Sequence, residues 1–176
     1  MHELEGHGGE HNSPLVIPVS ITMSILAVLV AAVTLLGHRA HTEELLLQGQ
    51  AVNQWAYYQA KNGRMNADQA IADLLGVVTT VDKDKSEAVR AKYHKEVERY
   101  SEDKDEISEK ASELQKERDL YQKRADHFDA GEGILEFALI ICSLTLLTNK
   151  KFFWFSGMTI AVAGVVVALT GFLVRI

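Results

Sequence analysis

The stretch YHKEVERYSEDKDEISEKASELQKERDLYQKRADHF, residues 93–128, decides the fold. Alternating steps of four and three residues pass through eleven positions, and nine of these are apolar or aromatic: Tyr93, Val97, Tyr100, Ile107, Ala111, Leu114, Tyr121, Ala125 and Phe128. Charged residues fill most positions between them, with supporting pairs such as Glu106 and Lys110. This period is typical of a helix that packs along another helix, so we predict a coiled-coil seam; a single solvated helix is the alternative.

The residues before this seam offer a partner of matching length. Residues 37–81 number 45 and residues 86–128 number 43, and the short polar run 82–85 between them suits a turn. We therefore predict an antiparallel helical hairpin over residues 37–129, reaching ~65 Å from its base.

Two details of this hairpin are less regular. Asn62-Gly63 predicts a pause in the first helix, and Asn66 followed by Gln69 resembles a capping box that starts another. Lys104 and Arg118 occupy the two polar seam positions; they either set the register or lie on an exposed edge.

Charge is concentrated in the middle of the chain. Of its 42 Asp, Glu, Lys and Arg residues, 27 lie within residues 82–129, whereas residues 15–36 and 152–174 contain none. Uncharged runs of 22 and 23 residues are long enough to span a bilayer, and we predict transmembrane helices over residues 14–36 and 152–174. A cleaved signal peptide is the alternative for the first, but it needs a basic start and a shorter apolar run. Residues 1–13 are polar and predict a disordered tail.

A third apolar segment, residues 130–148, completes the membrane part. Gly131-Glu132-Gly133 predicts a hinge at its start, and Asn149-Lys150-Lys151 predicts a tight connection to the last span. A re-entrant or surface-lying segment is the alternative, because the run is short and contains Glu136. The expected fold is an all-α integral membrane protein with three transmembrane helices and an extramembrane antiparallel coiled-coil hairpin.

Small residues form a stripe along the last span. They follow steps of four and three and share one helix face: Gly157, Ala161, Gly164, Ala168 and Gly171. Helices in lipid associate through close backbone approach, so this stripe predicts a helix-packing surface whose partner helix is left open. We interpret the stripe and the coiled-coil seam as two adhesive surfaces of a homo-oligomer.

Few residues suggest chemistry. Glu136, with Glu132 one turn earlier, could line an ion or proton path, or could simply lie near the lipid headgroups. His38, His41 and Glu44 could hold a metal, although histidines at a membrane boundary are often interfacial. Cys142 predicts a small buried thiol. No phosphate loop, nucleophile elbow or zinc-protease motif is present, so we expect no catalytic, cofactor or metal residues and no enzyme.

An aromatic segment carries a resemblance to a known family. NQWAYYQAK, residues 53–61, contains Trp55, Tyr57 and Tyr58, whose rings could pack against Tyr100, Tyr121 or a neighbouring subunit. With HFDAGEG (residues 127–133) and LLT (residues 146–148), it resembles a bacterial domain-of-unknown-function family of small membrane proteins. That resemblance implies the same layout, with an N-terminal span, a charged helical region and two C-terminal spans, and it implies no activity.

Basic residues near the span ends predict the orientation. The stalk side and C-terminus hold six, against Lys150 and Lys151 on the other side, which favours a cytoplasmic stalk and C-terminus with the N-terminus outside a bacterial inner membrane. The net charge of -6 argues against nucleic acid. We expect a scaffolding assembly module with itself, lipid and a larger membrane complex as partners; a channel or transporter component using Glu136 and a membrane sensor are the alternatives.

Overall fold

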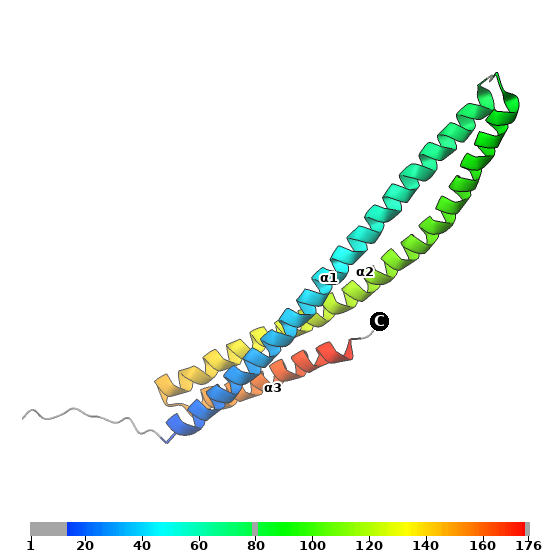
Figure 1. Ribbon diagram of the computed structural model, residues 1–176. Helices are drawn as coiled ribbons and strands as arrows, with labels where there is room; N and C mark the ends of the chain where they lie inside the picture. The colour runs from blue at the N-terminus through cyan, green and yellow to red at the C-terminus, as the bar shows by residue number, and fades with distance from the viewer. Residues whose placement is uncertain (1–13, 79–80, 175–176) are drawn as a thin grey trace, which may run out of the picture. The chain divides into compact units, whose positions relative to one another are not determined.

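The computed structural model describes residues 14–78 and 81–174, which contain three helices and no strand. Figure 1 shows α1 (Val16–Val77), α2 (Lys83–Thr148) and α3 (Lys151–Leu173). The predicted tail, residues 1–13, lies outside the described residues. The all-α fold class is confirmed, and each of the three helices is long and apolar enough to cross a membrane.

Both long helices run through positions where breaks are predicted from the sequence. α1 continues through Asn62-Gly63 and Asn66, and Gln69 Nε2 donates a hydrogen bond to Asp73 Oδ1 at 2.9 Å within the same helix. α2 continues through residues 131–133. The predicted pause, second helix start and hinge are therefore wrong. One glycine weakens a helix by only about 1 kcal/mol, which packing against a neighbouring helix readily offsets.

The chain divides into two compact units. The three-helix unit contains residues 14–41 and 123–174 of the described chain, and the hairpin unit contains residues 42–78 and 81–122.

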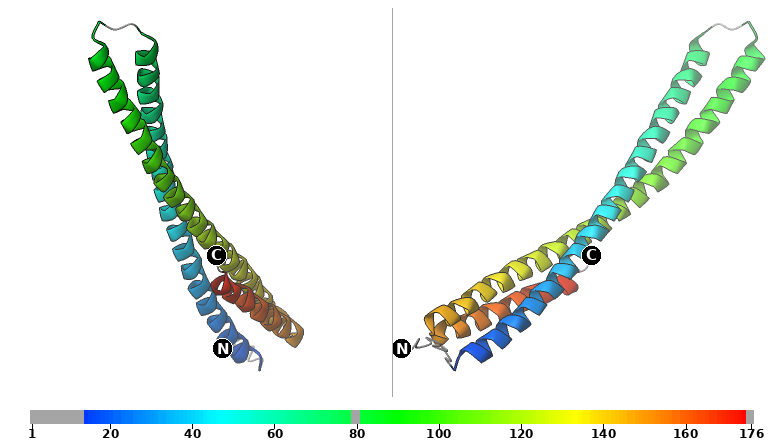
Figure 2. Two further views of the ribbon diagram at one scale, coloured as in Figure 1. Left: turned by 90° about the vertical axis from the view of Figure 1, so that its right-hand side faces the viewer. Right: turned by 60° about the vertical axis from the view of Figure 1, so that its left-hand side comes forward.

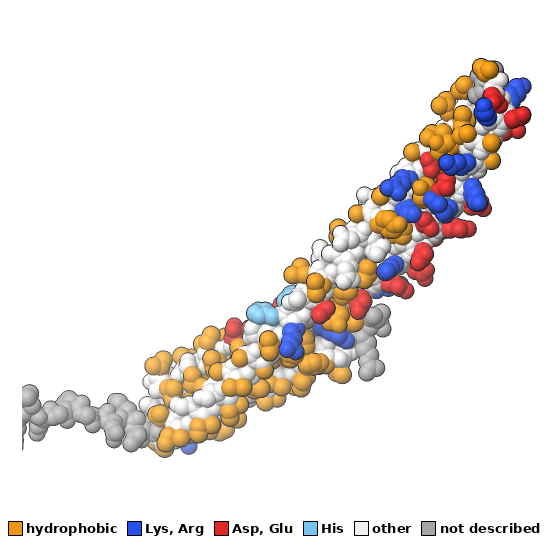
Figure 3. Space-filling view, viewed as in Figure 1, with side chains coloured by type: hydrophobic (Ala, Val, Ile, Leu, Met, Phe, Trp, Pro, Cys, Tyr) orange, Lys and Arg blue, Asp and Glu red, His pale blue; other side chains and the backbone are white. Residues whose placement is uncertain are grey.

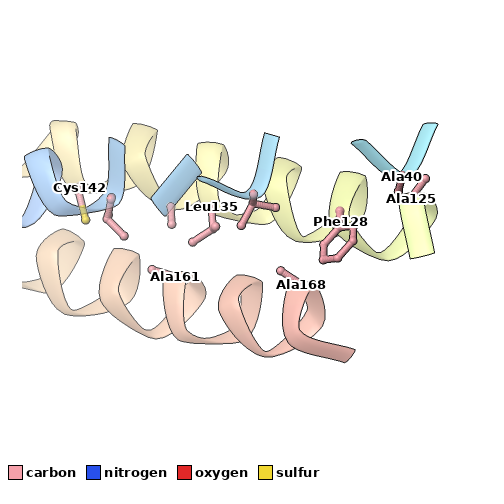
Figure 4. Close-up of a cluster of buried hydrophobic side chains, with 10 residues drawn as sticks. Ala40, Ala125, Phe128, Leu135, Cys142, Ala161 and Ala168 are labelled. Carbon is pink, nitrogen blue, oxygen red and sulfur yellow. The ribbon is translucent and has the colours of Figure 1, made fainter. Parts of the chain in front are cut away.

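The three-helix unit has one apolar core to which all three helices contribute. Leu26, Val33 and Ala40 come from α1 and Ala161 and Ala168 from α3, and α2 supplies the remainder: Ala125, Phe128, Leu135, Ala138 and Cys142 (Figure 4). The α1 members recur every seven residues, so they lie along one side of that helix. Small side chains make up half of this core, which lets the helices approach closely.

A two-residue link joins α2 to α3. α2 ends at Thr148 and α3 begins at Lys151. Asn149 has a left-handed backbone with φ of 53°, and its N–H donates to Thr145 O at 2.8 Å. Asparagine tolerates this conformation better than most residues, so it closes the last turn of α2.

The hairpin unit pairs the second part of α1 with the first part of α2, side by side and antiparallel, as both views of Figure 2 show. Its most buried apolar residues are Leu47, Ala51 and Ala72 on α1 and Ile107 and Ala111 on α2. α2 begins at Lys83, inside the run 82–85 predicted as a turn, because Asp82 Oδ1 accepts a hydrogen bond from the Lys85 N–H at 3.1 Å and caps the helix.

Candidate functional site

The coiled-coil seam predicted on α2 is buried most deeply in its second half. Ile107 and Ala111 are buried in the hairpin unit, and Ala125 and Phe128 are buried in the three-helix unit. The other five seam residues are half-buried: Tyr93, Val97, Tyr100, Leu114 and Tyr121. All nine therefore face inward to some degree.

The two polar seam residues behave differently. Lys104 reaches α1, where its Nζ lies 3.4 Å from Asn62 Oδ1 and 5.4 Å from the centre of the Tyr58 ring. Arg118 is half-buried and pairs with its neighbour Asp119 at 2.7 Å. Lys104 thus links the two helices of the hairpin, as a register-setting residue does, whereas this pair of Arg118 stays on α2.

Glu132 faces the interior of the three-helix unit. It is half-buried, and its Oε1 accepts a hydrogen bond from Thr34 Oγ1 of α1 at 2.6 Å. Glu136, one turn further along α2, is exposed. The two acids predicted as partners in an ion path are neighbours on one face of α2, with Glu132 bonded to Thr34 and Glu136 exposed.

Three hydroxyl groups on the described parts of α2 and α3 bond to their own helix. Ser143, Thr148 and Thr159 are exposed or half-buried and each donates to a carbonyl of its own helix, at 2.7 to 2.9 Å. Thr145 is fully buried, and its hydroxyl has no hydrogen-bond partner among the described residues.

A second polar contact joins α1 and α2 at the polar end of the unit. His41 Nε2 lies 2.9 Å from Asp129 Oδ2, and both side chains are about half exposed. Gly37 leaves room for this carboxylate, because a Cβ on it would lie 3.0 Å from Asp129 Oδ1. Within the described chain, no three His, Cys, Asp or Glu side chains are placed to hold a metal ion, so the alternative of a metal triplet at His38, His41 and Glu44 is not supported there.

The small-residue stripe of α3 packs against α2 of the same chain. All five stripe residues are buried: Gly157, Ala161, Gly164, Ala168 and Gly171. A Cβ on Gly157 would overlap the Cys142 sulfur, and one on Gly164 would lie 3.0 Å from Leu135. The partner helix that the sequence left open is therefore α2, and Cys142 is buried as predicted.

The aromatic segment surrounds a lysine in the hairpin unit. Lys61 Nζ lies 2.6 Å from Asp103 Oδ2 and sits 5.5 and 5.0 Å from the ring centres of Tyr57 and Tyr100. The hydrogen bond to Asp103 raises the pKa of Lys61 above its ordinary value, and Tyr57 acts in the same direction. This cluster fixes α1 against α2.

The other two rings of the aromatic segment contact each other. The rings of Trp55 and Tyr58 meet edge to face with centres 5.5 Å apart, and Tyr58 also lies near Lys104 of α2. The sequence left Tyr100, Tyr121 and a neighbouring subunit open as partners of these rings, and the central role of Lys61 was not predicted. The available signal was a lysine that follows two tyrosines by three and four residues.

Sequence reasoning also missed contacts that connect distant segments of the three-helix unit. Trp154 Nε1 donates to Thr22 Oγ1 at 3.2 Å, which ties the start of α3 to α1. A guanidinium nitrogen of Arg124 donates to the carbonyl of Val174 at 3.3 Å, where a positive charge complements the end of α3. Neither pair has a sequence spacing that would reveal it.

Comparison with known proteins identifies a family and leaves its activity open. Searches of curated proteins and of solved structures find no match. A family model described as a domain of unknown function, DUF4337, matches residues 15–174, which is nearly the whole described chain. This match confirms the resemblance seen in the aromatic segment, and the chain therefore belongs to the DUF4337 family.

Proposed function

We propose that this chain is a non-enzymatic, homo-oligomeric membrane protein that acts as a scaffolding assembly module. The three-helix unit supplies the anchor. Large apolar side chains on its outer surface are more than half exposed on every helix, for example Val28, Ile140 and Phe155. Figure 3 shows hydrophobic side chains covering the visible face of this unit. Such a surface suits lipid, where hydrophobic side chains need no other cover.

The observation that carries the assembly role is an uneven surface on the hairpin unit. Seven large hydrophobic residues of α1 are exposed there: Leu45, Leu46, Val52, Tyr57, Ile71, Leu74 and Val77. Among the described residues of α2 in this unit, Val89 is the one comparable case. Charged residues are concentrated on α2 instead: residues 83–122 contain 22 Asp, Glu, Lys and Arg residues, and residues 42–77 contain six. A water-facing hairpin with one apolar side is expected to bind a partner on that side.

The proposed contact surface for assembly is the outer side of α1. The seam of α2 and the stripe of α3, which the sequence suggested as oligomer contacts, are both packed within one chain. They build the anchor and the hairpin, and the outer side of α1 stays available for assembly.

The proposed setting is the bacterial inner membrane, with the hairpin and C-terminus in the cytoplasm and the N-terminus outside. The excess of basic residues on the hairpin side supports this orientation. Transport through Glu136 has weaker support, because that side chain is exposed, whereas Glu132 one turn earlier is bonded to Thr34.

Mass measurement of the protein extracted in native lipid tests the assembly role. We expect a multiple of 19.5 kDa, with any larger partner as additional mass. A strictly monomeric species at membrane concentrations would refute the proposal. In proteoliposomes, ion flux that the Glu136→Gln substitution abolishes would instead support the transport alternative.

A further inference from the structure

A regular stripe runs along the outer side of α1 in the hairpin unit. Steps of three and four residues alternate without a slip through ten positions: Leu46, Gly49, Asn53, Ala56, Ala60, Gly63, Ala67, Ala70, Leu74 and Val77. All ten are exposed and none is charged. We call this set the outer stripe.

The outer stripe lies opposite the side of α1 that packs on α2. Leu47, Ala51 and Ala72 are buried against α2. They lie two residues from the stripe members Gly49, Asn53 and Ala70, respectively, which is a rotation of about 200° around the helix. α1 therefore carries two heptad patterns, one on each side. A 3.5-residue repeat of this length matches another long helix that lies alongside, and a compact globular partner has no need of it.

Two glycines in the stripe have no role within the chain. A Cβ built on Gly49 or Gly63 meets nothing within 4 Å, whereas Gly131, Gly157 and Gly164 are each in close contact with a neighbouring helix. A glycine inside a helix is less stable than alanine there, so close approach of another backbone is the usual reason for it. Among the described residues, no other backbone lies within 4 Å of a Cβ built at Gly49 or Gly63.

We propose that the outer stripe binds the outer stripe of a second copy of this chain, in parallel, about a two-fold axis along α1. This inference rests on the proposed function and names its contact surface. In such a pair each residue meets its own counterpart, so Gly49, Ala56, Ala60 and Gly63 bring the two backbones close together. The heavily charged outer side of α2 is a poor match for an uncharged stripe, which leaves α1 itself as the complement.

Both the area and the polar residue fit this pairing. The stripe is ~47 Å long and about 10 Å wide, so two copies together bury roughly 940 Å², close to the ~1,000 Å² that a specific interface needs. Anchoring in one membrane raises the local concentration of copies and orients them alike.

Asn53, the one polar member of the outer stripe, would face Asn53 of the second copy, an arrangement that fixes register in parallel coiled coils.

Disulfide cross-linking of the full-length protein in native lipid tests the pairing. In a Cys142→Ala background, the substitutions Leu46→Cys, Ala60→Cys and Ala67→Cys are each expected to give a covalent dimer on mild oxidation. Ser101→Cys is the matched control, because Ser101 is exposed on α2 near the level of the Lys61–Asp103 pair. It is expected to remain monomeric.

A bulky side chain introduced into the outer stripe gives a second test, measured as the dissociation constant of the dimer. Gly63→Leu adds a side chain where the single chain has open space, so the helix should persist and the monomer should unfold at or slightly above the parent temperature, because leucine favours a helix more than glycine does. The dimer dissociation constant should rise about tenfold or more, because the two backbones can no longer approach. Ser101→Leu should leave this constant unchanged.

Each outcome has a distinct meaning. An oligomer that persists without cross-links at the three stripe positions overturns this inference and leaves the proposed function standing, whereas a monomeric native mass refutes both. A cross-link between Leu46→Cys and Leu74→Cys chains in a mixture, with none in the Leu46→Cys or Ala67→Cys protein alone, would show antiparallel pairing and overturn the parallel arrangement.

Discussion

Two glycines on α2 should respond oppositely to the same substitution. A Cβ on Gly131 would lie 2.7 Å from Ala168 Cβ and 2.9 Å from its Cα, whereas one on Gly133 would meet nothing within 4 Å. Carbon atoms in contact normally lie about 3.5–4.0 Å apart, so Gly131→Ala must push α2 and α3 apart by roughly 1 Å.

The magnitude follows from two opposing effects. Replacing glycine by alanine stabilises a helix by about 0.5–1 kcal/mol at either site, while overpacking at Gly131 costs about 1–3 kcal/mol. The helix contribution cancels in the difference, so Gly131→Ala should be less stable than Gly133→Ala by about 1–3 kcal/mol. For a chain of this size that corresponds to melting temperatures roughly 2–12 °C apart.

Thermal unfolding of the detergent-solubilised protein, followed by helical circular dichroism, measures both variants under identical conditions. Gly133→Ala is expected to melt at or above the parent protein and Gly131→Ala below it. Equal shifts in the same direction would show that α2 and α3 do not pack through Gly131, and the packing assigned to the α3 stripe would then be incorrect.

Four further substitutions test individual side chains. Thr34→Val removes the hydrogen bond to Glu132 and should lower the free energy of unfolding by about 1 kcal/mol. Glu136→Gln changes an exposed side chain and should alter this free energy by less than about 0.5 kcal/mol. Equal losses for the two variants would contradict the inward position of Glu132. Asp103→Asn should lower the pKa of Lys61, read by NMR of its Nζ group. Because the pKa of Lys61 is raised in the folded chain, the Lys61–Asp103 pair stabilises the hairpin fully below about pH 10.4, the pKa of lysine in an unfolded chain. This stabilisation is lost as the pH rises through the pKa of Lys61 in the folded chain. Asp103→Asn should therefore make the free energy of unfolding less dependent on pH in the alkaline range. Thr145→Val removes a buried hydroxyl without a partner and should raise the unfolding free energy by roughly 1 kcal/mol in the same thermal assay; a loss would reveal a hydrogen bond at that site.

Sequence patterns predicted the features that depend on local periodicity. The seam from Tyr93 to Phe128 and the stripe from Gly157 to Gly171 both face inward, since a regular repeat on a helix fixes which side is apolar before any partner is known. The partner of the seam was also predicted, from the matching length of the preceding segment. The partner of the α3 stripe was not, because nothing local to α3 indicates that its glycines contact residues near Cys142 and Leu135.

Helix continuity and polar pairing were harder to predict. Gly131-Glu132-Gly133 and Asn62-Gly63 read as breaks from intrinsic preference alone, yet packing keeps both segments helical. Thr34 and Glu132 are 98 residues apart, so their hydrogen bond depends on the register between α1 and α2. The outer stripe was not predicted from the sequence, because alanine and glycine contribute little to a hydrophobic pattern.

The short link at Asn149 and Lys150 would constrain how the chain is inserted into the proposed membrane. With two residues between Thr148 and Lys151, the end of α2 and the start of α3 would emerge on the same face of a bilayer that both helices cross. In that setting neither helix inverts alone, so a change of flanking charge that inverts one would invert the other and move the C-terminus to the opposite compartment.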